Sequence, residues 1–385
     1  MSLILSADEQ ALRDSVRRFV ADRSPLTAVR ELIAAGEPYD LAVWKQLAAQ
    51  LGVAGLTIPE EYGGAGAGHA AMAVALQELG AGLVPSPLLA SAVLAAGTLL
   101  RLDDEAARRD LLPGIASGEL VATLAITGGA GGKDAAGGPG AAGGAVRAAG
   151  TGAQVTLTGE LAPVLNGAQA DVLLVPADAG VGDGDGVGVY LVDAGARGLT
   201  RVALTAADPT RALARIRLDD TPARALAGDG ASALAAAADL ANLALAAEQC
   251  GAMAACLAMT TEYAKLRVAF GQPIGAFQGV KHRLADMETA WELAHATLRA
   301  AARSADEEPG SFAADACVAR IMISGPYFTA AADTIQLHGG IGFTWEHDAH
   351  LYYKNALSGQ VLLGGPGDQL DRLAATLDAV DARGV

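Results

Sequence analysis

Two short stretches in the carboxyl-terminal third of the chain carry residue types that can bind a charged, flat ligand. In the first, residues 262–287, Arg267 and Phe270 stand where a long helical pattern ends. An arginine fork is a permanent cation that suits a phosphate or pyrophosphate, and a spacing of three places both residues on one side of a last helical turn. Glycines and a proline at 271–275 then break the pattern. We expect two helices joined by a turn that carries a cation and an aromatic ring.

The second stretch, residues 336–354, begins with Gln336 and His338 and continues into Gly339 and Gly340. Consecutive glycines let another backbone or a ligand approach closely. A helix-terminal arginine and a core phenylalanine would explain the first stretch alone. Because the second stretch adds a polar, glycine-rich opening, we favour a ligand-binding role for both.

Together, R-x-x-F-G-Q-P-I-x-x-F-Q and Q-L-H-G-G-x-G-F-T-W-E resemble the paired motifs of the acyl-CoA dehydrogenase family. The resemblance is closer to the bacterial branch that includes steroid side-chain-degrading members. It implies FAD as the cofactor, and in that family these groups reach across a dimer interface to the neighbour's flavin. The positions that correspond to the contacts with pyrophosphate and adenosine are Arg267, Phe270, Gln278, Gln336, Gly339 and Gly340.

The chain departs from the family around the flavin ring. The family signature T-E-P-x-x-G-S-D corresponds to residues 127–134, where Thr127 is kept and is assigned to a hydrogen bond with the flavin, whereas Lys133 replaces a serine. The family run W-x-T-N-G corresponds to P-V-L-N-G at residues 163–167, which lacks the aromatic ring and the hydroxyl. The side of the site that faces the ring is therefore expected to be weaker than the side that faces the dinucleotide.

Dehydrogenation of an acyl-CoA requires a carboxylate to remove the α-proton while hydride leaves the β-carbon. One family position for this base corresponds to L-L-G-G at residues 362–365 and another to Ala241, so neither supplies a carboxylate. Glu248 lies two turns after Ala241 on nearly the same helix face. We expect Glu248 to be the catalytic base, with its proton affinity raised by apolar surroundings. The alternative is a glutamate that pairs with a cation such as Arg267 or reaches solvent.

Composition limits the class of protein. The chain has 385 residues, 52% of them hydrophobic, and a formal net charge of −16, which suits two or three domains with a large core. That charge would repel nucleic acid and anionic membrane surfaces. Cys250, Cys256 and Cys317 are too few for a disulfide framework, so we expect buried thiols in a cytoplasmic protein.

Three further patterns are read as structural. Ser6 followed by Glu9 predicts a capping box at the start of a helix rather than a signal peptide. The longest apolar stretch, 88–100, is too short to span a bilayer and is expected to be a core helix. Glu346, Asp348 and His350 lack the second histidine pair or the cysteines of a zinc site, so we predict no metal.

Periodicity divides the chain into three parts and predicts an α+β protein with the acyl-CoA dehydrogenase arrangement. An N-terminal helical domain is expected at 1–118, a central β-domain with five strands at 119–227, and a C-terminal helical bundle at 228–385. The glycine- and alanine-rich stretch 128–152 is expected to be a mobile excursion. A phosphate-binding loop there is disfavoured, because no strand–loop–helix pattern surrounds it.

The predicted function is that of an FAD-dependent acyl-CoA dehydrogenase. The resemblance implies an acyl-CoA substrate, with a preference for bulky or ring-bearing thioesters, an electron-transfer flavoprotein as acceptor, and a homo- or hetero-oligomer (dimer or tetramer). One alternative is a subunit with a degenerate site that completes a partner's FAD site in a mixed tetramer. A flavin-free helical scaffold is a further alternative, which the paired motifs disfavour because a scaffold would not need them.

Overall fold

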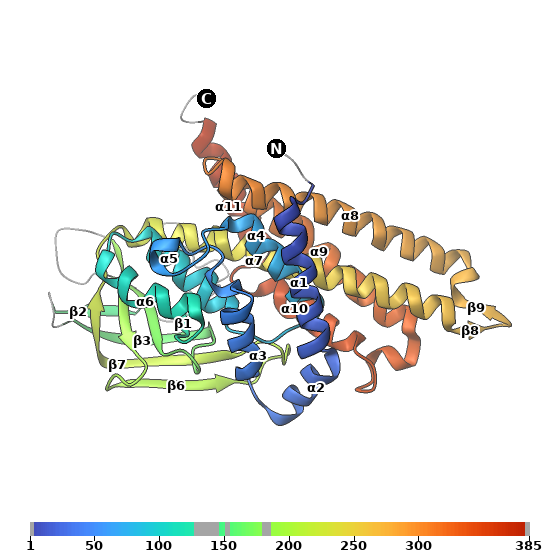
Figure 1. Ribbon diagram of the computed structural model, residues 1–385, viewed down its shortest axis with the longest axis horizontal. Helices are drawn as coiled ribbons and strands as arrows, with labels where there is room; N and C mark the ends of the chain where they lie inside the picture. Colours follow the sequence, from blue (N-terminus) through green and yellow to red (C-terminus); the bar gives the residue numbers. More distant parts are fainter. Residues whose placement is uncertain (1–3, 127–145, 151–154, 179–185, 382–385) are drawn as a thin grey trace.

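The computed structural model describes residues 4–126, 146–150, 155–178 and 186–381. Helices lie at the N-terminal end, strands in the middle of the chain and a bundle of long helices at the C-terminal end (Figure 1). This order confirms the predicted fold class. Thr127 and Lys133, for which roles were predicted above, lie outside the described residues.

The N-terminal helices begin at a capping box, as predicted. The Ser6 hydroxyl accepts a hydrogen bond from the Glu9 amide at 3.2 Å, and the Glu9 carboxylate accepts one from the Ser6 amide at 2.7 Å. The elements are α1 (Ala7–Arg23), α2 (Leu26–Ala35), α3 (Leu41–Lys45), η1 (Gln46–Gln50), η2 (Val53–Gly55), η3 (Glu60–Tyr62), α4 (Gly68–Ala81), η4 (Leu89–Ala95), α5 (Ala96–Arg101) and α6 (Glu105–Ser117).

The central strands form one seven-stranded sheet. Its path is β1-β4-β2-β3-β7-β5, β5 also pairs with β4, and β6 adds to β7. All pairings are antiparallel except β1–β4 and β2–β4. The strands are β1 (Ala122–Leu124), β2 (Arg147–Ala149), β3 (Val155–Leu165), β4 (Val172–Asp178), β5 (Val187–Asp193), β6 (Leu199–Leu204) and β7 (Leu213–Ala225).

Five of these strands correspond to predicted ones, and β2 and β6 do not. Strand β2 lies within the stretch 128–152, for which no element was expected, so that part of the prediction is wrong. It is three residues long and has no hydrophobic run that would predict a strand. Its place is set by pairing with β3. Strand β6 has no buried residue, so it lacks the hydrophobic side that marks a half-buried strand.

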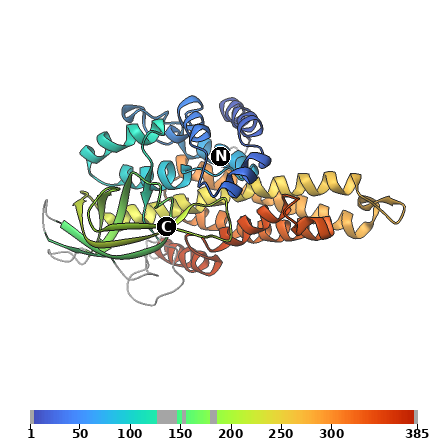
Figure 2. The same cartoon turned by 90° about the horizontal axis from the view of Figure 1, so that it is seen from below.

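The C-terminal part is built around one long central helix. Seen from below, α7 runs from the sheet to the far tip of the molecule, with the N-terminal helices on one side and the last helices on the other (Figure 2). The elements are α7 (Gly230–Leu266), β8 (Val268–Ala269), β9 (Gln272–Pro273), η5 (Ile274–Ala276), α8 (Gln278–Glu307), α9 (Phe312–His338), η6 (Gly339–Phe343), α10 (Ala349–Val361) and α11 (Pro366–Asp381).

Helix α7 is long and apolar enough to cross a membrane, and among the described residues it alone has these properties. However, 78% of its most apolar window is buried inside the protein. The helix therefore has the character of a core helix. The residues of the apolar stretch 88–100 are also mostly buried, as expected for a core helix.

All three cysteines are buried and unpaired, as predicted. Burial raises the pKa of Cys250 to about 12 and that of Cys256 to about 12. Because the thiolate is the reactive form, these thiols are inert packing groups.

Two glycines allow α4 and α7 to cross closely. A Cβ atom on Gly251 would overlap the backbone carbonyl of Gln77, and one on Gly80 would overlap the backbone of Glu248. The crossing therefore fixes the depth at which Glu248 lies against α4.

We predict that Gly251→Ala lowers the free energy of unfolding by about 1–3 kcal/mol, because the added methyl group forces two backbones apart. The matched control is Gly279→Ala in α8, where a Cβ would meet nothing within 4 Å. That variant should be unchanged or slightly more stable, since alanine favours a helix over glycine. Urea unfolding of both proteins tests this, and equal midpoints would contradict the close crossing.

Candidate active site

The first motif forms a hairpin rather than a simple turn between helices. Helix α7 ends at Leu266, so Arg267 is its extended C-cap residue, and β8 and β9 then pair Ala269 with Gln272. The prediction that Phe270 continues the last helical turn is wrong. Instead, Phe270 (φ 52°) and Gly271 (φ 83°) form a two-residue turn with positive φ at both positions, as a tight hairpin requires.

Phe270 is held in an unfavourable backbone conformation while its side chain is 96% exposed. A left-handed conformation costs a non-glycine residue about 1–2 kcal/mol. The only ring contact of Phe270 among the described residues is with Phe277, edge to face at 6.2 Å. The hairpin therefore presents an aromatic ring outward, where this chain does not cover it.

The second motif presents open backbone at the end of α9. Gly339 caps α9 with φ 63°, and a Cβ atom on Gly339 or Gly340 would meet nothing within 4 Å. No other part of the described chain occupies the space in front of these glycines. The motif therefore leaves room for a group from outside the chain.

The two motifs lie at the same end of the helical bundle. The ring of Tyr263 in α7 stacks on His338 at 4.3 Å, and the Tyr263 hydroxyl donates to the backbone carbonyl of His338 at 3.4 Å. Within the described chain the Arg267 guanidinium has no carboxylate partner, so its charge is available. The six residues assigned to the dinucleotide are all exposed: Arg267, Phe270, Gln278, Gln336, Gly339 and Gly340.

A group of imidazoles, two of them buried, lies beside the second motif. His338 Nδ1 lies 2.7 Å from the carbonyl of Thr334, and the His347 ring lies 4.4 Å from the His338 ring. His350 packs against Trp345 at 4.6 Å, and both of its ring nitrogens are buried without a hydrogen-bond partner. These rings belong to the residues that precede and follow the 339–343 turn.

Burial keeps these imidazoles neutral. It lowers the pKa of His338 and that of His347. For His350, burial and then the nearby Lys354 and Arg30 lower the pKa to about 4.

The acidic residues of this region have no metal-binding arrangement. Asp348 pairs with Arg30 of α2 at 2.9 Å. The described residues contain no group of three His, Cys, Asp or Glu side chains that could hold a metal ion.

The run at 163–167, which was expected to face the flavin ring, is bound to its neighbours through backbone groups. The Asn166 amide, at φ 48°, donates to the carbonyl of Ala212 at 2.8 Å. The Leu165 carbonyl accepts from the Thr123 hydroxyl at 2.6 Å. The run therefore lies against the connection between β6 and β7, which also reaches Glu248.

Glu248 does not lie in wholly apolar surroundings, so that part of the prediction is wrong. The Arg211 guanidinium donates hydrogen bonds to both carboxylate oxygens of Glu248, with Nη1 3.4 Å from Oε1 and Nη2 still closer to Oε2. The side chains are only 17% and 15% exposed, respectively. Arg211 lies 37 residues earlier in the sequence, where no local pattern could reveal the pairing.

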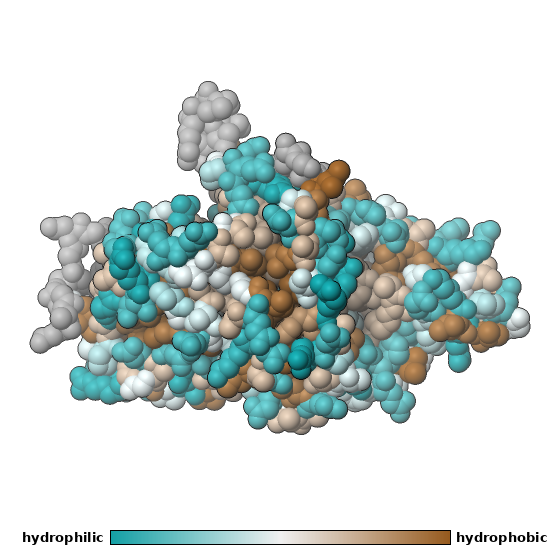
Figure 3. Space-filling view, viewed as in Figure 1, coloured by the Kyte–Doolittle hydropathy of each residue, from teal (hydrophilic) through white to brown (hydrophobic). Residues whose placement is uncertain are grey.

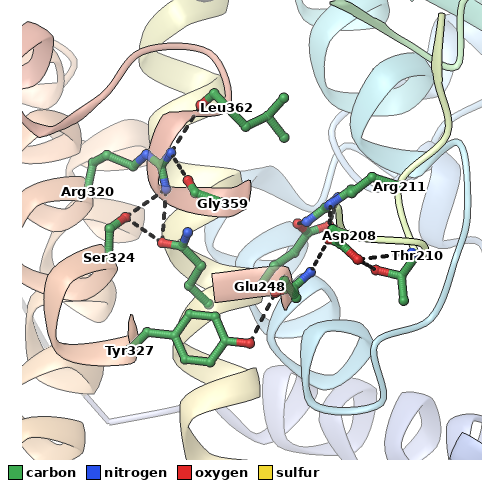
Figure 4. A network of polar contacts seen from close by, with 11 residues as sticks. Asp208, Thr210, Arg211, Glu248, Arg320, Ser324, Tyr327, Gly359 and Leu362 are labelled. Carbon is green, nitrogen blue, oxygen red and sulfur yellow. Dashed lines mark hydrogen bonds and ion pairs between the residues drawn. The ribbon is translucent and has the colours of Figure 1, made fainter. Parts of the chain in front are cut away.

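The ion pair belongs to a larger polar network (Figure 4). The buried Asp208 accepts hydrogen bonds from the Thr210 amide at 2.9 Å and from the Asn355 side chain at 2.9 Å. Asn355 in turn accepts from the Tyr327 hydroxyl at 3.1 Å. Burial opposes the charge of Arg211, but the carboxylates of Glu248 and Asp208 outweigh it and raise the pKa of Arg211.

A second buried cation fixes the turn that carries the base in the resembling family. Arg320 of α9 is 2% exposed and donates to Gln249 and Ser324 side chains at 2.9 and 2.7 Å. It also donates to the carbonyls of Gly359 and Leu362 at the end of α10. Burial lowers the pKa of Arg320 to about 10. An arginine within the apolar run C-V-A-R-I-M-I was a signal of this role that our sequence analysis missed.

Glu248 and the dinucleotide motif are far apart. They are nineteen residues apart along the chain, which is about 28 Å along a helix that rises 1.5 Å per residue. The alternative in which Glu248 pairs with Arg267 is therefore wrong in its partner, because the cation is Arg211. One helix thus presents two separate polar centres.

Known proteins are similar to this chain over nearly all of its length. Family models for the N-terminal and C-terminal domains of acyl-CoA dehydrogenases match residues 6–119 and 228–377. The acyl-CoA dehydrogenase IpdE2 of Mycobacterium tuberculosis is 37% identical over 95% of this chain and 96% of its own length. The chain belongs to the acyl-CoA dehydrogenase family.

Solved structures of this family support the same assignment. The ChsE4-ChsE5 complex from Mycobacterium tuberculosis has a TM-score of 0.87 and 31% identity, covering 98% of this chain and 99% of that one. A variant of the Tcur3481-Tcur3483 steroid ACAD has a TM-score of 0.85 and 32% identity, covering 97% and 99%. The chain is thus related to oxidoreductases that act on the CH–CH group of an acyl-CoA with FAD as cofactor.

The exposed cation and glycines of this acyl-CoA dehydrogenase fit the anionic pyrophosphate part of FAD. When bound, FAD would supply its flavin ring as the hydride acceptor. Arg267 offers a free fork, and Gly339 and Gly340 offer open backbone. The assignment of the individual contacts, and of Thr127, stays a prediction. On the ring side, the described run 163–167 supplies backbone groups but neither an aromatic ring nor a hydroxyl.

The imidazoles give a prediction for pH. The unfolded chain takes up a proton on His350 near the usual pKa of about 6.5, whereas the folded protein does so only near pH 4. Because the folded-state pKa is depressed, stability is full above about pH 6.5 and is lost as the pH falls toward 4. The slope is at most about 1.4 kcal/mol per pH unit for each such histidine.

Urea unfolding between pH 7.5 and 5 tests this prediction. His350→Phe keeps an aromatic ring beside Trp345. In this variant the unfolding free energy should fall less steeply on acidification, by up to the slope that one histidine contributes. Identical slopes in the parent and the variant would show that His350 is not the group concerned.

Proposed function

We propose that this acyl-CoA dehydrogenase chain completes the FAD site of a partner chain in a mixed tetramer. The observation that carries the proposal is an asymmetry along α7. At one end, the described groups assigned to pyrophosphate and adenosine are all exposed, and Arg267 has no carboxylate partner there. Toward the other end, the family's base positions hold Ala241 and the L-L-G-G run at 362–365, and Glu248 is occupied by Arg211.

Exposed apolar side chains at the same end support contact with another chain. They lie in the hairpin and in the segment after Gly340, and Figure 3 shows hydrophobic surface over the hairpin. Clustered exposed apolar residues mark protein interfaces. The exposed fractions are 58% for Val268, 96% for Phe270, 69% for Phe343 and 61% for Trp345. The ChsE4-ChsE5 relative is itself described as a complex, which agrees with a subunit that works with a second chain.

The substrate class proposed for this assembly is a bulky or ring-bearing CoA thioester. The support is the similarity to a steroid ACAD over nearly the whole chain. We further propose an electron-transfer flavoprotein as the acceptor and a cytoplasmic location, which suits three unpaired, buried thiols.

A self-sufficient enzyme with Glu248 as the base is the second candidate. The observation in its favour is that Glu248 is the one carboxylate among the residues lining a small cavity between α4, α7 and the β6–β7 connection. To take a proton, Glu248 would first have to leave the Arg211 fork. In this version Glu248→Gln keeps its flavin while single-turnover flavin reduction by an acyl-CoA falls roughly a few hundredfold.

We predict that Arg267→Ala weakens FAD binding by the co-expressed assembly about tenfold to a hundredfold, because a charge-assisted contact to pyrophosphate is lost. The control is Arg109→Ala, which removes an exposed arginine that pairs with Glu105 within α6 and should leave affinity unchanged. Fluorescence titration of the apo-assembly with FAD measures both. Parental affinity in Arg267→Ala would refute the role of this residue.

We predict that the chain purified alone holds less than one FAD per chain, and that co-expression with its partner restores flavin. The reason is that the dinucleotide-binding groups of one chain have no ring pocket to serve without the other. Flavin absorbance per chain after gel filtration measures this. A full complement of flavin in the isolated chain, reducible by an acyl-CoA, would instead establish the self-sufficient enzyme.

A further inference from the structure

The space beside Glu248, the candidate base, is nearly filled. The cavity beside Glu248 has a volume of only about 20 Å³, which holds little more than one water molecule. It is lined by the end of α4 and the segment after it, by Thr210 and Arg211 of the β6–β7 connection, by Glu248 of α7 and by Asn355 of α10. Parts of the chain from all three regions of the sequence therefore meet there.

The Arg211–Glu248 pair crosses this junction. Arg211 belongs to the connection that also receives the Asn166 amide at Ala212, and Glu248 belongs to the central helix. The pair therefore joins the ring-facing run of the sheet to α7 by one two-pronged contact. A bidentate contact of this kind fixes both partners in orientation as well as distance.

Neighbouring groups hold the arginine in that position. Asp208 lies 3.9 Å from Arg211 Nε and is itself bound by Thr210 and Asn355. Figure 4 shows Asp208 and Thr210 beside Arg211, which faces Glu248. Because Asp208 is 1% exposed and its partners come from two segments, the arginine cannot swing away without breaking a buried network.

The glutamate is equally constrained. Helix α4 lies so close to α7 that a Cβ atom on Gly80 would overlap the Glu248 backbone. The backbone of Glu248 is therefore packed directly against α4, which leaves little space around it. The charges of the pair are balanced where they are, and separating them would leave two buried charges without partners, which is costly.

We propose that Arg211 and Glu248 form a lock that closes this chain's own acyl pocket, with Asp208 as the residue that positions Arg211. The inference rests on the proposed function, in which the reaction takes place in the partner's pocket. The lock keeps CoA thioesters out of a pocket that lacks a free base, and it makes the chain a rigid support for the partner's cofactor.

Two double variants test the lock in the co-expressed assembly, and both remove the same charges. Arg211→Gln with Glu248→Gln keeps the pocket filled, whereas Arg211→Ala with Glu248→Ala empties it. Calorimetric titration with octanoyl-CoA, and with CoA lacking an acyl chain as a control, counts the sites. We expect the double glutamine variant to bind as many octanoyl-CoA molecules as the parent. The double alanine variant should gain up to one octanoyl-CoA site for each copy of this chain.

Thermal unfolding adds a second readout. Arg211→Gln alone leaves a buried carboxylate unpaired and should lower the Tm by several degrees, and the added Glu248→Gln should recover most of that loss. The same octanoyl-CoA stoichiometry in the parent and the double alanine variant would overturn the lock, as would additive single effects on Tm. The flavin content of the isolated chain is a separate measurement. The proposed function can therefore fail on flavin content, while the number of octanoyl-CoA sites still shows whether the Arg211–Glu248 pair closes the pocket.

Discussion

The close packing of α7 against its neighbours is the constraint on which the rest of the structure depends. Its surface is largely alanine, and glycines at its crossing with α4 let the two backbones touch. Small side chains give a helix good intrinsic propensity and a close approach, but they leave little room for polar groups. Each polar group placed along α7 therefore needs a specific partner, which explains why Glu248 and Gln249 both contact arginines.

Arg211 and Arg320 contact neighbouring residues of α7 but have different roles. Arg211 neutralises a carboxylate, whereas Arg320 is surrounded by neutral acceptors, two of which are carbonyls at the end of α10. Helix C-termini attract cations because their last carbonyls lack partners. Arg320 thus positions the 362–365 turn, and Leu363 completes that turn at φ 58°. The structure holds this turn firmly although it offers no base.

The sequence predicted local features of the fold and failed where distant segments meet. The capping box at Ser6 and five of the strands follow from short patterns, whose physical causes lie within a few residues, and the dinucleotide contacts of the two motifs stay a prediction. The hairpin at Phe270 was missed because two positive φ values at F-G look like an ordinary glycine break. Strand β2 was missed because the three residues R-A-A have no strand pattern of their own and are placed by pairing with β3 and β4. The partner of Glu248 could not be read at all, since Arg211 approaches it through the tertiary fold.

The distance between the two polar centres on α7 explains how such a chain can keep one function while changing another. Residues at the hairpin and at Gly339 face outward, so they contribute nothing to the core and their loss would not destabilise the fold. Glu248 and Arg211 are only 15% and 17% exposed and form an ion pair, so each constrains the other. A chain whose own pocket became closed would lose its exposed dinucleotide groups unless a second molecule used them. Their joint presence on the outer end of the bundle, beside exposed aromatic rings, is therefore best explained by a partner that takes its cofactor contacts from this surface.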